Sequence, residues 1–233
     1  MSKAIIGLVA KHSDVDKKIT STFVNDEMKD AVFANGGIAI GIIPSMRKIT
    51  LANNKNEEWV SRNVDDLFTQ EEKDNLVAQI KLCDGIILSG GGRTDAYEIF
   101  VAKYCYEHDI PIIGICAGQN NIVRAVGGKI KRVSKRWVHQ SKKKYAHKVF
   151  ISSESKFFDF VKGEMRVNSR HKNIVAECGA LLVAGYDEFG NIEIVEDKTK
   201  KCYVGMRFHP ESLFTEDENH NMIFKKFIEV CKK

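Results

Sequence analysis

Short, uninterrupted apolar runs alternate with amphipathic segments along the first half of the chain. Unbroken apolar runs of this length are typical of strands that are buried on both faces. The runs that predict strands are AIIGLVA (4–10), IAIGIIP (38–44), the GIIL before the glycines in GIILSGGG (85–92) and PIIGIC (111–116). The pattern therefore predicts an α/β fold with a mainly parallel central sheet flanked by helices.

The segments between these runs carry helix start and stop signals. Asn25 is a candidate cap for a helix within 25–37, and Thr69 is a candidate cap for a helix within 69–83. Further helices are expected within 95–109, 117–128 and 219–232.

After about residue 128 the pattern changes to short strand-like pieces joined by turns. The residues DEFGN (187–191) form a hairpin signal, and CYVGMRF (202–208) is the expected last core strand. The second half is therefore predicted to form an antiparallel extension of the sheet, and the whole chain, 1–233, to form one domain. The other strand-like pieces are KVFIS (148–152), MRVNS (165–169), GALLVAGYD (179–187) and GNIEIVED (190–197).

Composition places the protein among globular enzymes rather than membrane proteins. No apolar run approaches the roughly 20 residues that cross a bilayer. The first residues are read as a strand because their apolar part is short and lacks a cleavage site. We therefore expect a cytoplasmic protein with reduced thiols and no membrane partner. The six cysteines form no C-x-x-C pair and no zinc-like spacing with histidine: Cys83, Cys105, Cys116, Cys178, Cys202 and Cys231.

Much of the net charge of +5 lies in one basic run, 129–148, which also contains Trp137 and Tyr145. Cations with interleaved aromatic rings can bind nucleic acid. A solvated hairpin is the favoured interpretation, so no nucleic-acid partner is expected. The sequence leaves the oligomeric state open, a homodimer included.

The sequence GICAG (114–118) places Cys116 between two glycines, at the end of a predicted strand and the start of a predicted helix. A nucleophile at such a turn has a strained backbone, and neighbours without a Cβ relieve the crowding. The helix that follows directs its N-terminal dipole at the sulfur, which favours the thiolate. The N–H of Ala117 is then the natural first donor to an oxyanion. A buried structural cysteine is the alternative.

Two further segments supply what such a thiol needs. The glycines of SGGG (89–92) can turn backbone N–H groups toward an anion, and the following Arg93 and Thr94 do not complete a Walker phosphate loop. In FHPES (208–212), His209 and Glu211 project to the same side of an extended chain. A carboxylate beside an imidazole fixes its tautomer, as a general base for a thiol requires.

Together and in this order, SGGG, GICAG and FHPES resemble the oxyanion loop, cysteine elbow and His-Pro-Glu segment of the class I glutamine amidotransferase superfamily, which has a flavodoxin-like fold. AIIGLVA, CDGIILSGGG, VNSRH and YVGMRFHPESL look most like its γ-glutamyl hydrolase branch, which includes γ-glutamyl-γ-aminobutyrate hydrolase.

The resemblance implies a Cys116 nucleophile, a His209 base, an orienting Glu211, and an oxyanion hole from the N–H groups of Gly91 and Ala117. It implies hydrolysis of a small γ-glutamyl compound through a glutamyl thioester, with no metal and no organic cofactor. Residues proposed for substrate contact are Gly90, Gln119, Asn120 and His171, with Arg93, Arg136 and Lys172 as candidate partners of a substrate carboxylate.

The chain departs from the superfamily pattern at the fourth residue after the cysteine. The superfamily usually has a glutamine there that helps hold the glutamyl group, and this chain has Asn120. Two alternatives therefore stay open. One is a glutaminase that delivers ammonia to a partner synthetase, and the other is a non-catalytic binding protein on the same scaffold.

Overall fold

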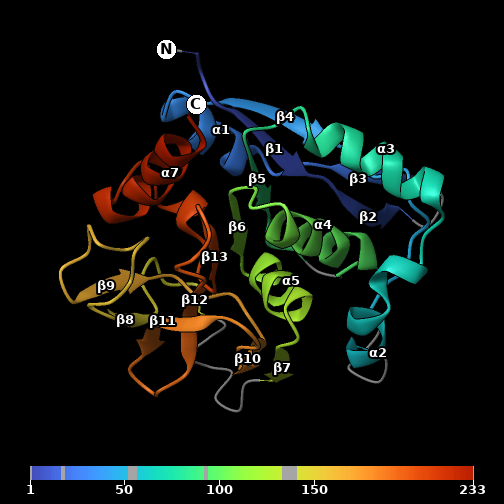
Figure 1. Cartoon of the computed structure of the whole chain (residues 1–233). Coiled ribbons are helices and arrows are strands. Elements are labelled where there is room, and N and C mark those ends of the chain that lie inside the picture. Colours follow the sequence, from blue (N-terminus) through green and yellow to red (C-terminus); the bar gives the residue numbers. More distant parts are fainter. Residues whose placement is uncertain (1, 17–18, 52–56, 92–93, 133–140, 233) are drawn as a thin grey trace.

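The computed structural model describes residues 2–16, 19–51, 57–91, 94–132 and 141–232. Its main feature is an eleven-stranded mixed sheet that crosses the whole molecule (Figure 1), and its strand order is β4-β1-β5-β6-β13-β12-β11-β8-β9, with β10 and β7 continuing from β12. The α/β fold expected from the sequence is confirmed. The helices are α1 (Asp26–Ala34), α2 (Glu57–Arg62), α3 (Gln70–Ile80), α4 (Ala96–Glu107), α5 (Ala117–Ala125) and α7 (Glu218–Cys231).

The first half of the sheet is parallel. Its strands are β4 (Ile38–Ile42), β1 (Ile5–Val9), β5 (Gly85–Leu88), β6 (Ile112–Ile115) and β13 (Tyr203–Met206). At the centre, Leu88 of β5 lies opposite Gly114 of β6, and Met206 of β13 lies opposite Ile115 of β6. These three strands therefore run side by side and end at the same edge of the sheet.

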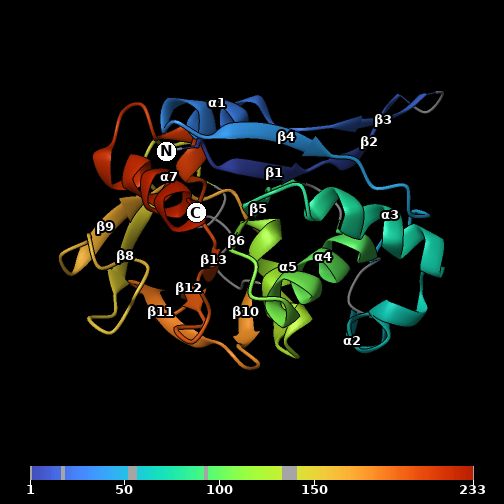
Figure 2. The ribbon, with the colours of Figure 1, turned by 45° about the horizontal axis from the view of Figure 1, so that its top comes forward.

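Helices cover both faces of the parallel strands (Figure 2). Alternate residues of one strand enter different cores, since Ile87 packs with α1 and α7 while Ile86 and Leu88 pack with α3, α4 and α5. This is why the strands contain almost no polar residue. The expected helix caps are also present, because Asn25 accepts a hydrogen bond from Met28 N and Thr69 forms a capping box with Glu72.

The second half of the chain adds antiparallel strands to the edge of β13. They are β7 (Lys129–Arg132), β8 (His147–Ile151), β9 (Glu164–Val167), β10 (Asn173–Glu177), β11 (Leu182–Asp187) and β12 (Ile192–Glu196). The turn predicted at 187–191 joins β11 to β12, and Asp187 Oδ1 accepts hydrogen bonds from the N–H groups of Phe189 and Asn191. The antiparallel extension is therefore confirmed.

Several elements were not expected from the sequence. A separate hairpin of β2 (Lys11–Asp16) and β3 (Ile19–Phe23) follows β1, and a short helix, α2, precedes the 3₁₀ turn Val64–Asp66. The basic run contributes β7, which pairs with β10 rather than within the run. Its residues 133–140, with Arg136, Trp137 and His139, lie outside the described residues. The single-domain assignment stays a prediction. No helix in the described parts is both long and apolar enough to span a bilayer.

Candidate active site

Cys116 joins β6 to α5 in a strained backbone conformation, with φ of 53° and ψ of −101°. A non-glycine residue with positive φ is uncommon, and strain of this kind gathers at functional sites. The flanking glycines are needed for close packing: a Cβ on Gly118 would lie 2.2 Å from the carbonyl oxygen of Leu88, and one on Gly114 would lie 2.6 Å from the Gly118 carbonyl group. The sequence therefore builds a tight strand-to-helix elbow, because no side chain fits beside it.

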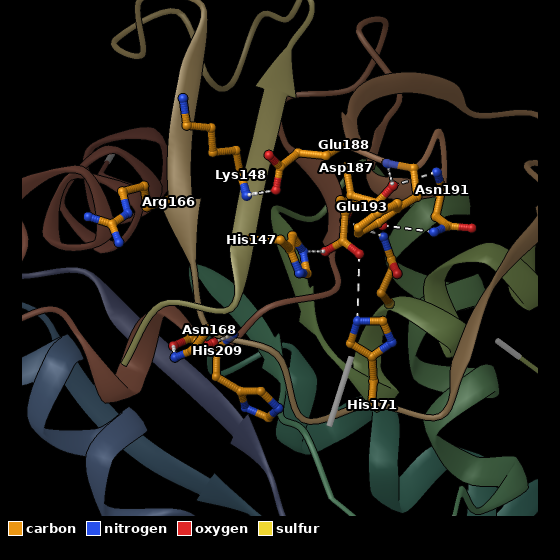
Figure 3. Close-up of polar contacts among 12 residues, drawn as sticks. His147, Lys148, Arg166, Asn168, His171, Asp187, Glu188, Asn191, Glu193 and His209 are labelled. Carbon is orange, nitrogen blue, oxygen red and sulfur yellow. Dashed lines mark hydrogen bonds and ion pairs between the residues drawn. The ribbon is translucent and has the colours of Figure 1, made fainter. Parts of the chain in front are cut away.

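His209 and Glu211 lie just beyond the end of β13. His209 Nδ1 is 2.7 Å from Glu211 Oε1, and the Glu211 side chain is buried. The backbone of His209 is also held, because Asn168 Nδ2 donates to its carbonyl oxygen (2.7 Å) while its N–H donates to Asn168 Oδ1 (2.8 Å). Figure 3 shows Asn168 against the backbone of His209. Both the ring and the main chain of His209 are thus fixed by side chains.

Gly90 shows how closely the three segments approach. A Cβ placed on Gly90 would lie 2.7 Å from Cε1 of His209 and 3.3 Å from Cβ of Cys116. The imidazole of His209 also forms a hydrogen bond with the Cys116 thiol. The loop after β5, the elbow after β6 and the segment after β13 therefore meet at one point, although they are far apart in the sequence.

The electrostatics of this group favour an ion pair. Burial alone would raise the pKa of the Cys116 thiol, but the hydrogen bond to His209 and the charges of His209 and Arg207 outweigh it, so the pKa is lowered. Burial opposes a charged His209, but the Glu211 carboxylate and the Cys116 sulfur outweigh it and raise the pKa of His209 to about 10. A thiolate beside an imidazolium is the form that attacks carbonyl carbon.

The glycine loop lies beside a buried ion pair that the sequence did not suggest. Gly91 has φ of 141°, and a Cβ there would lie 3.0 Å from Cδ of Lys11. Lys11 Nζ is 2.6 Å from Glu98 Oε1, and both side chains are almost fully buried. Ser89 is buried, while Gly92 and Arg93 lie outside the described residues. Lys11 of the hairpin thus supports the loop that is expected to bind an oxyanion.

Two of the residues proposed for substrate contact face the protein interior. Gln119 is fully buried, and its Nε2 donates to the carbonyl oxygens of Glu193 (2.9 Å) and Gly205 (3.2 Å). Asn120 is nearly buried, and its Oδ1 accepts from Nη1 of Arg207 (2.7 Å). Both side chains are therefore engaged with the sheet behind the elbow, and their role in substrate contact stays a prediction.

His171 belongs to a buried polar cluster (Figure 3), in which its Nε2 lies 3.5 Å from Glu193 Oε1 and His147 Nε2 lies 3.6 Å from Glu193 Oε2. Burial alone would raise the pKa of Glu193, but the two imidazoles lower it to about 2. Asp187 completes a set of potential metal-ligand atoms within 4.8 Å of one another. Because Asp187 already accepts hydrogen bonds from its own turn, the cluster is better described as a buried ion-pair network.

With this geometry established, the chain was compared with known proteins. The sequence model of the family "Glutamine amidotransferase class-I" matches residues 48–230. The chain belongs to this family. The class I amidotransferase is 34% identical over 163 residues to the glutamine-hydrolysing GMP synthase subunit of Methanococcus aeolicus, which covers 66% of this chain and 78% of that protein. The corresponding protein of Methanocaldococcus jannaschii is 32% identical over 152 residues, 63% of this chain and 73% of that protein.

Solved structures agree on the fold of the amidotransferase. A glutamine amidotransferase from Thermotoga maritima superposes with a TM-score of 0.62 at 12% identity and covers all of both chains. A Thermoplasma acidophilum protein described as a GMP synthase component gives a TM-score of 0.64 at 19% identity, over 99% of this chain and 95% of that one. The family expected from the three motifs is therefore confirmed. These relatives do not support the narrower placement in the γ-glutamyl hydrolase branch.

Proposed function

We propose that the protein hydrolyses the side-chain amide of glutamine and passes the ammonia to a separate synthetase. The observation that carries the proposal is the meeting of Cys116, His209 and Glu211 around Gly90, in a family of glutamine amidotransferases. The glutamine-hydrolysing relatives support glutamine as the substrate, and their description as one of the subunits of GMP synthase supports a partner protein.

In the proposed reaction, the Cys116 thiolate attacks the γ-carbonyl carbon and forms a C–S bond. The carbonyl oxygen becomes an oxyanion, which the N–H groups of Ala117 and Gly91 stabilise. As the C–N bond breaks, the His209 imidazolium gives its proton to the departing nitrogen, and ammonia leaves. His209 then takes a proton from water, which attacks the thioester and releases glutamate and the free thiol. Glu211 keeps the imidazole oriented throughout.

A second candidate is the hydrolysis of γ-glutamyl compounds with larger leaving amines. Two observations favour it. Asn120 stands where the superfamily usually has a glutamine that holds the glutamyl group, and its amide is paired with Arg207. In addition, the family match begins at residue 48, yet Lys11, from the unmatched N-terminal part, packs against Gly91. A non-family segment at the oxyanion loop gives this chain its own means of shaping the substrate pocket.

The experiment is a panel of glutamine and γ-glutamyl amides, assayed for glutamate release with the wild type and with Cys116→Ala. We expect release by the wild type only, and a glutamyl adduct on Cys116 detected by mass spectrometry after acid quenching. A ratio of kcat/KM that favours glutamine, rising when a synthetase is added, supports the first proposal. A ratio that favours bulkier amides supports the second. Full activity of Cys116→Ala, or no labelling of Cys116 by a glutamine-like chloroketone, would refute both and favour a binding protein.

A further inference from the structure

Arg207 is a buried cation directly behind the elbow. It is 1% exposed and follows β13, two residues before His209. Its backbone N–H donates to the carbonyl oxygen of Glu193 (2.8 Å), which ties its main chain to β12. Burying a guanidinium costs free energy unless its donors are well paired. The partners of its side chain therefore show what this arginine does.

Both acceptors of the guanidinium are in the elbow. Arg207 Nη1 donates to the carbonyl oxygen of Cys116 (3.0 Å) and to Oδ1 of Asn120 (2.7 Å). Cys116 is the candidate nucleophile, and Asn120 lies one turn later on α5. One nitrogen of Arg207 thus bridges the strained residue and the first turn of the helix that follows it.

We propose that Arg207 positions the oxyanion hole by holding the peptide between Cys116 and Ala117 in one orientation. This proposal rests on the proposed function, in which Ala117 N–H receives the oxyanion. The peptide is trans and planar, so its C=O and its N–H point in opposite directions. A donor that fixes the carbonyl of Cys116 behind the elbow therefore fixes the N–H of Ala117 toward the opposite side.

The position of the elbow makes such a device necessary. Cys116 has a positive φ, which costs on the order of 1–3 kcal/mol and persists only where surrounding contacts hold it. A rotation of this one peptide would relieve the strain and would turn the Ala117 N–H away from the reacting carbon. The hydrogen bond from Arg207 opposes that rotation, and the bond is charge-assisted, which makes it stronger than a neutral one.

The charge of Arg207 has a second effect on the same group. Burial lowers the pKa of Arg207 to about 10, so the guanidinium remains charged at neutral pH. Its charge contributes, after that of His209, to the lowered pKa of the Cys116 thiol. A cation on the carbonyl also polarises the peptide, which makes the N–H on its other side a better donor.

The proposal also accounts for Asn120, the residue where this chain departs from the superfamily pattern. Asparagine is one methylene shorter than glutamine, and the guanidinium of Arg207 occupies the space between its amide and the Cys116 carbonyl. Asn120 is then a positioning partner of Arg207. Residues that act through one shared hydrogen-bond network are expected to be non-additive when both are changed.

The test compares Arg207→Met, which removes the donor and the charge, with Arg207→Lys, which keeps the charge. For glutamine hydrolysis we expect Arg207→Met to lower kcat by about 10²-fold, the usual effect of losing one oxyanion donor, with KM changed less than about threefold. Arg207→Lys is expected to lie between the two. Combining Arg207→Met with Asn120→Ala is expected to cost little beyond Arg207→Met alone, because Asn120 acts through Arg207.

A second measurement separates positioning from structure and from the proposed function. An N-acylated glutamate γ-semialdehyde adds the Cys116 thiol to give a tetrahedral oxyanion adduct without any turnover. We expect Arg207→Met to weaken this adduct about as much as it lowers kcat, while the maximal rate of iodoacetamide alkylation at high pH stays within about threefold. Unchanged aldehyde affinity in Arg207→Met would overturn the proposal, whether or not glutamine is the substrate. So would a loss confined to KM and to the thermal unfolding midpoint.

Discussion

Gly90 gives the sharpest test of how the three segments meet. In Gly90→Ala, the new methyl carbon would lie 2.7 Å from Cε1 of His209 and 3.3 Å from Cβ of Cys116. Carbon atoms in contact prefer about 3.5–4.0 Å, so the imidazole must move by about 1 Å or rotate away. Displacing a catalytic group by this distance costs about 10²-fold in rate, which corresponds to about 2.7 kcal/mol of transition-state stabilisation.

The assay is glutamate release from the preferred γ-glutamyl substrate, together with the pH dependence of Cys116 alkylation by iodoacetamide. We expect Gly90→Ala to lower kcat by about 10²-fold and to move the alkylation midpoint to higher pH, since the thiolate loses its imidazolium partner. Gly90 does not have a positive φ, so backbone strain does not explain such a loss. Gly41→Ala is the matched control, because its Cβ would meet only Val24 Cγ2 at 3.7 Å. Wild-type kcat and an unchanged alkylation profile in Gly90→Ala would refute the described geometry.

Three further predictions concern other parts of the site. Glu211→Gln removes the carboxylate that helps raise the pKa of His209 to about 10, so the alkylation midpoint should rise by about one pH unit or more; an unchanged midpoint would argue against a stabilised ion pair. Glu193 has a pKa of about 2 in the folded protein, below its ordinary value of 4.5, so it stabilises the fold above that range and the effect is lost as pH falls toward 2. Glu193→Gln should therefore reduce the free energy of urea unfolding at pH 7 by about 3–5 kcal/mol and flatten its acid dependence, and equal stability at pH 7 would contradict the ion-pair network. Gly118→Ala places a Cβ 2.2 Å from the backbone oxygen of Leu88, so thermal unfolding should show a loss of about 3 kcal/mol, and a fully stable variant would be inconsistent with the elbow.

The parallel half of the fold could be predicted because its signals are local. Buried strands such as 111–116 are unbroken apolar runs, and Asn25 and Thr69 mark helix starts with their own side chains. The elbow at Cys116 was predictable for the same reason, since flanking glycines are visible in five consecutive residues.

The supporting residues could not be predicted, because their partners lie far away in the sequence. Lys11 ends an apolar run and reads as a surface charge, but its partner Glu98 is 87 residues away. Arg207 likewise reads as a strand-end cation, although its acceptors are 87 and 91 residues away. Only its position in the apolar run YVGMRF, just before His209, could have suggested burial. The hairpin β2–β3 carries no alternating apolar face that would have marked it as a pair of strands.

The arrangement of β5, β6 and β13 has a consequence for how such an enzyme can diversify. Each reacting segment is the direct continuation of one of three hydrogen-bonded neighbours in the middle of the sheet, so the distances between sulfur, imidazole and glycine loop are inherited from backbone registry. Peripheral insertions, such as the N-terminal hairpin, can be exchanged without disturbing that registry. Chemistry and selectivity can then evolve on separate parts of one chain, and grafting a new rim onto this sheet is the natural route to altered specificity.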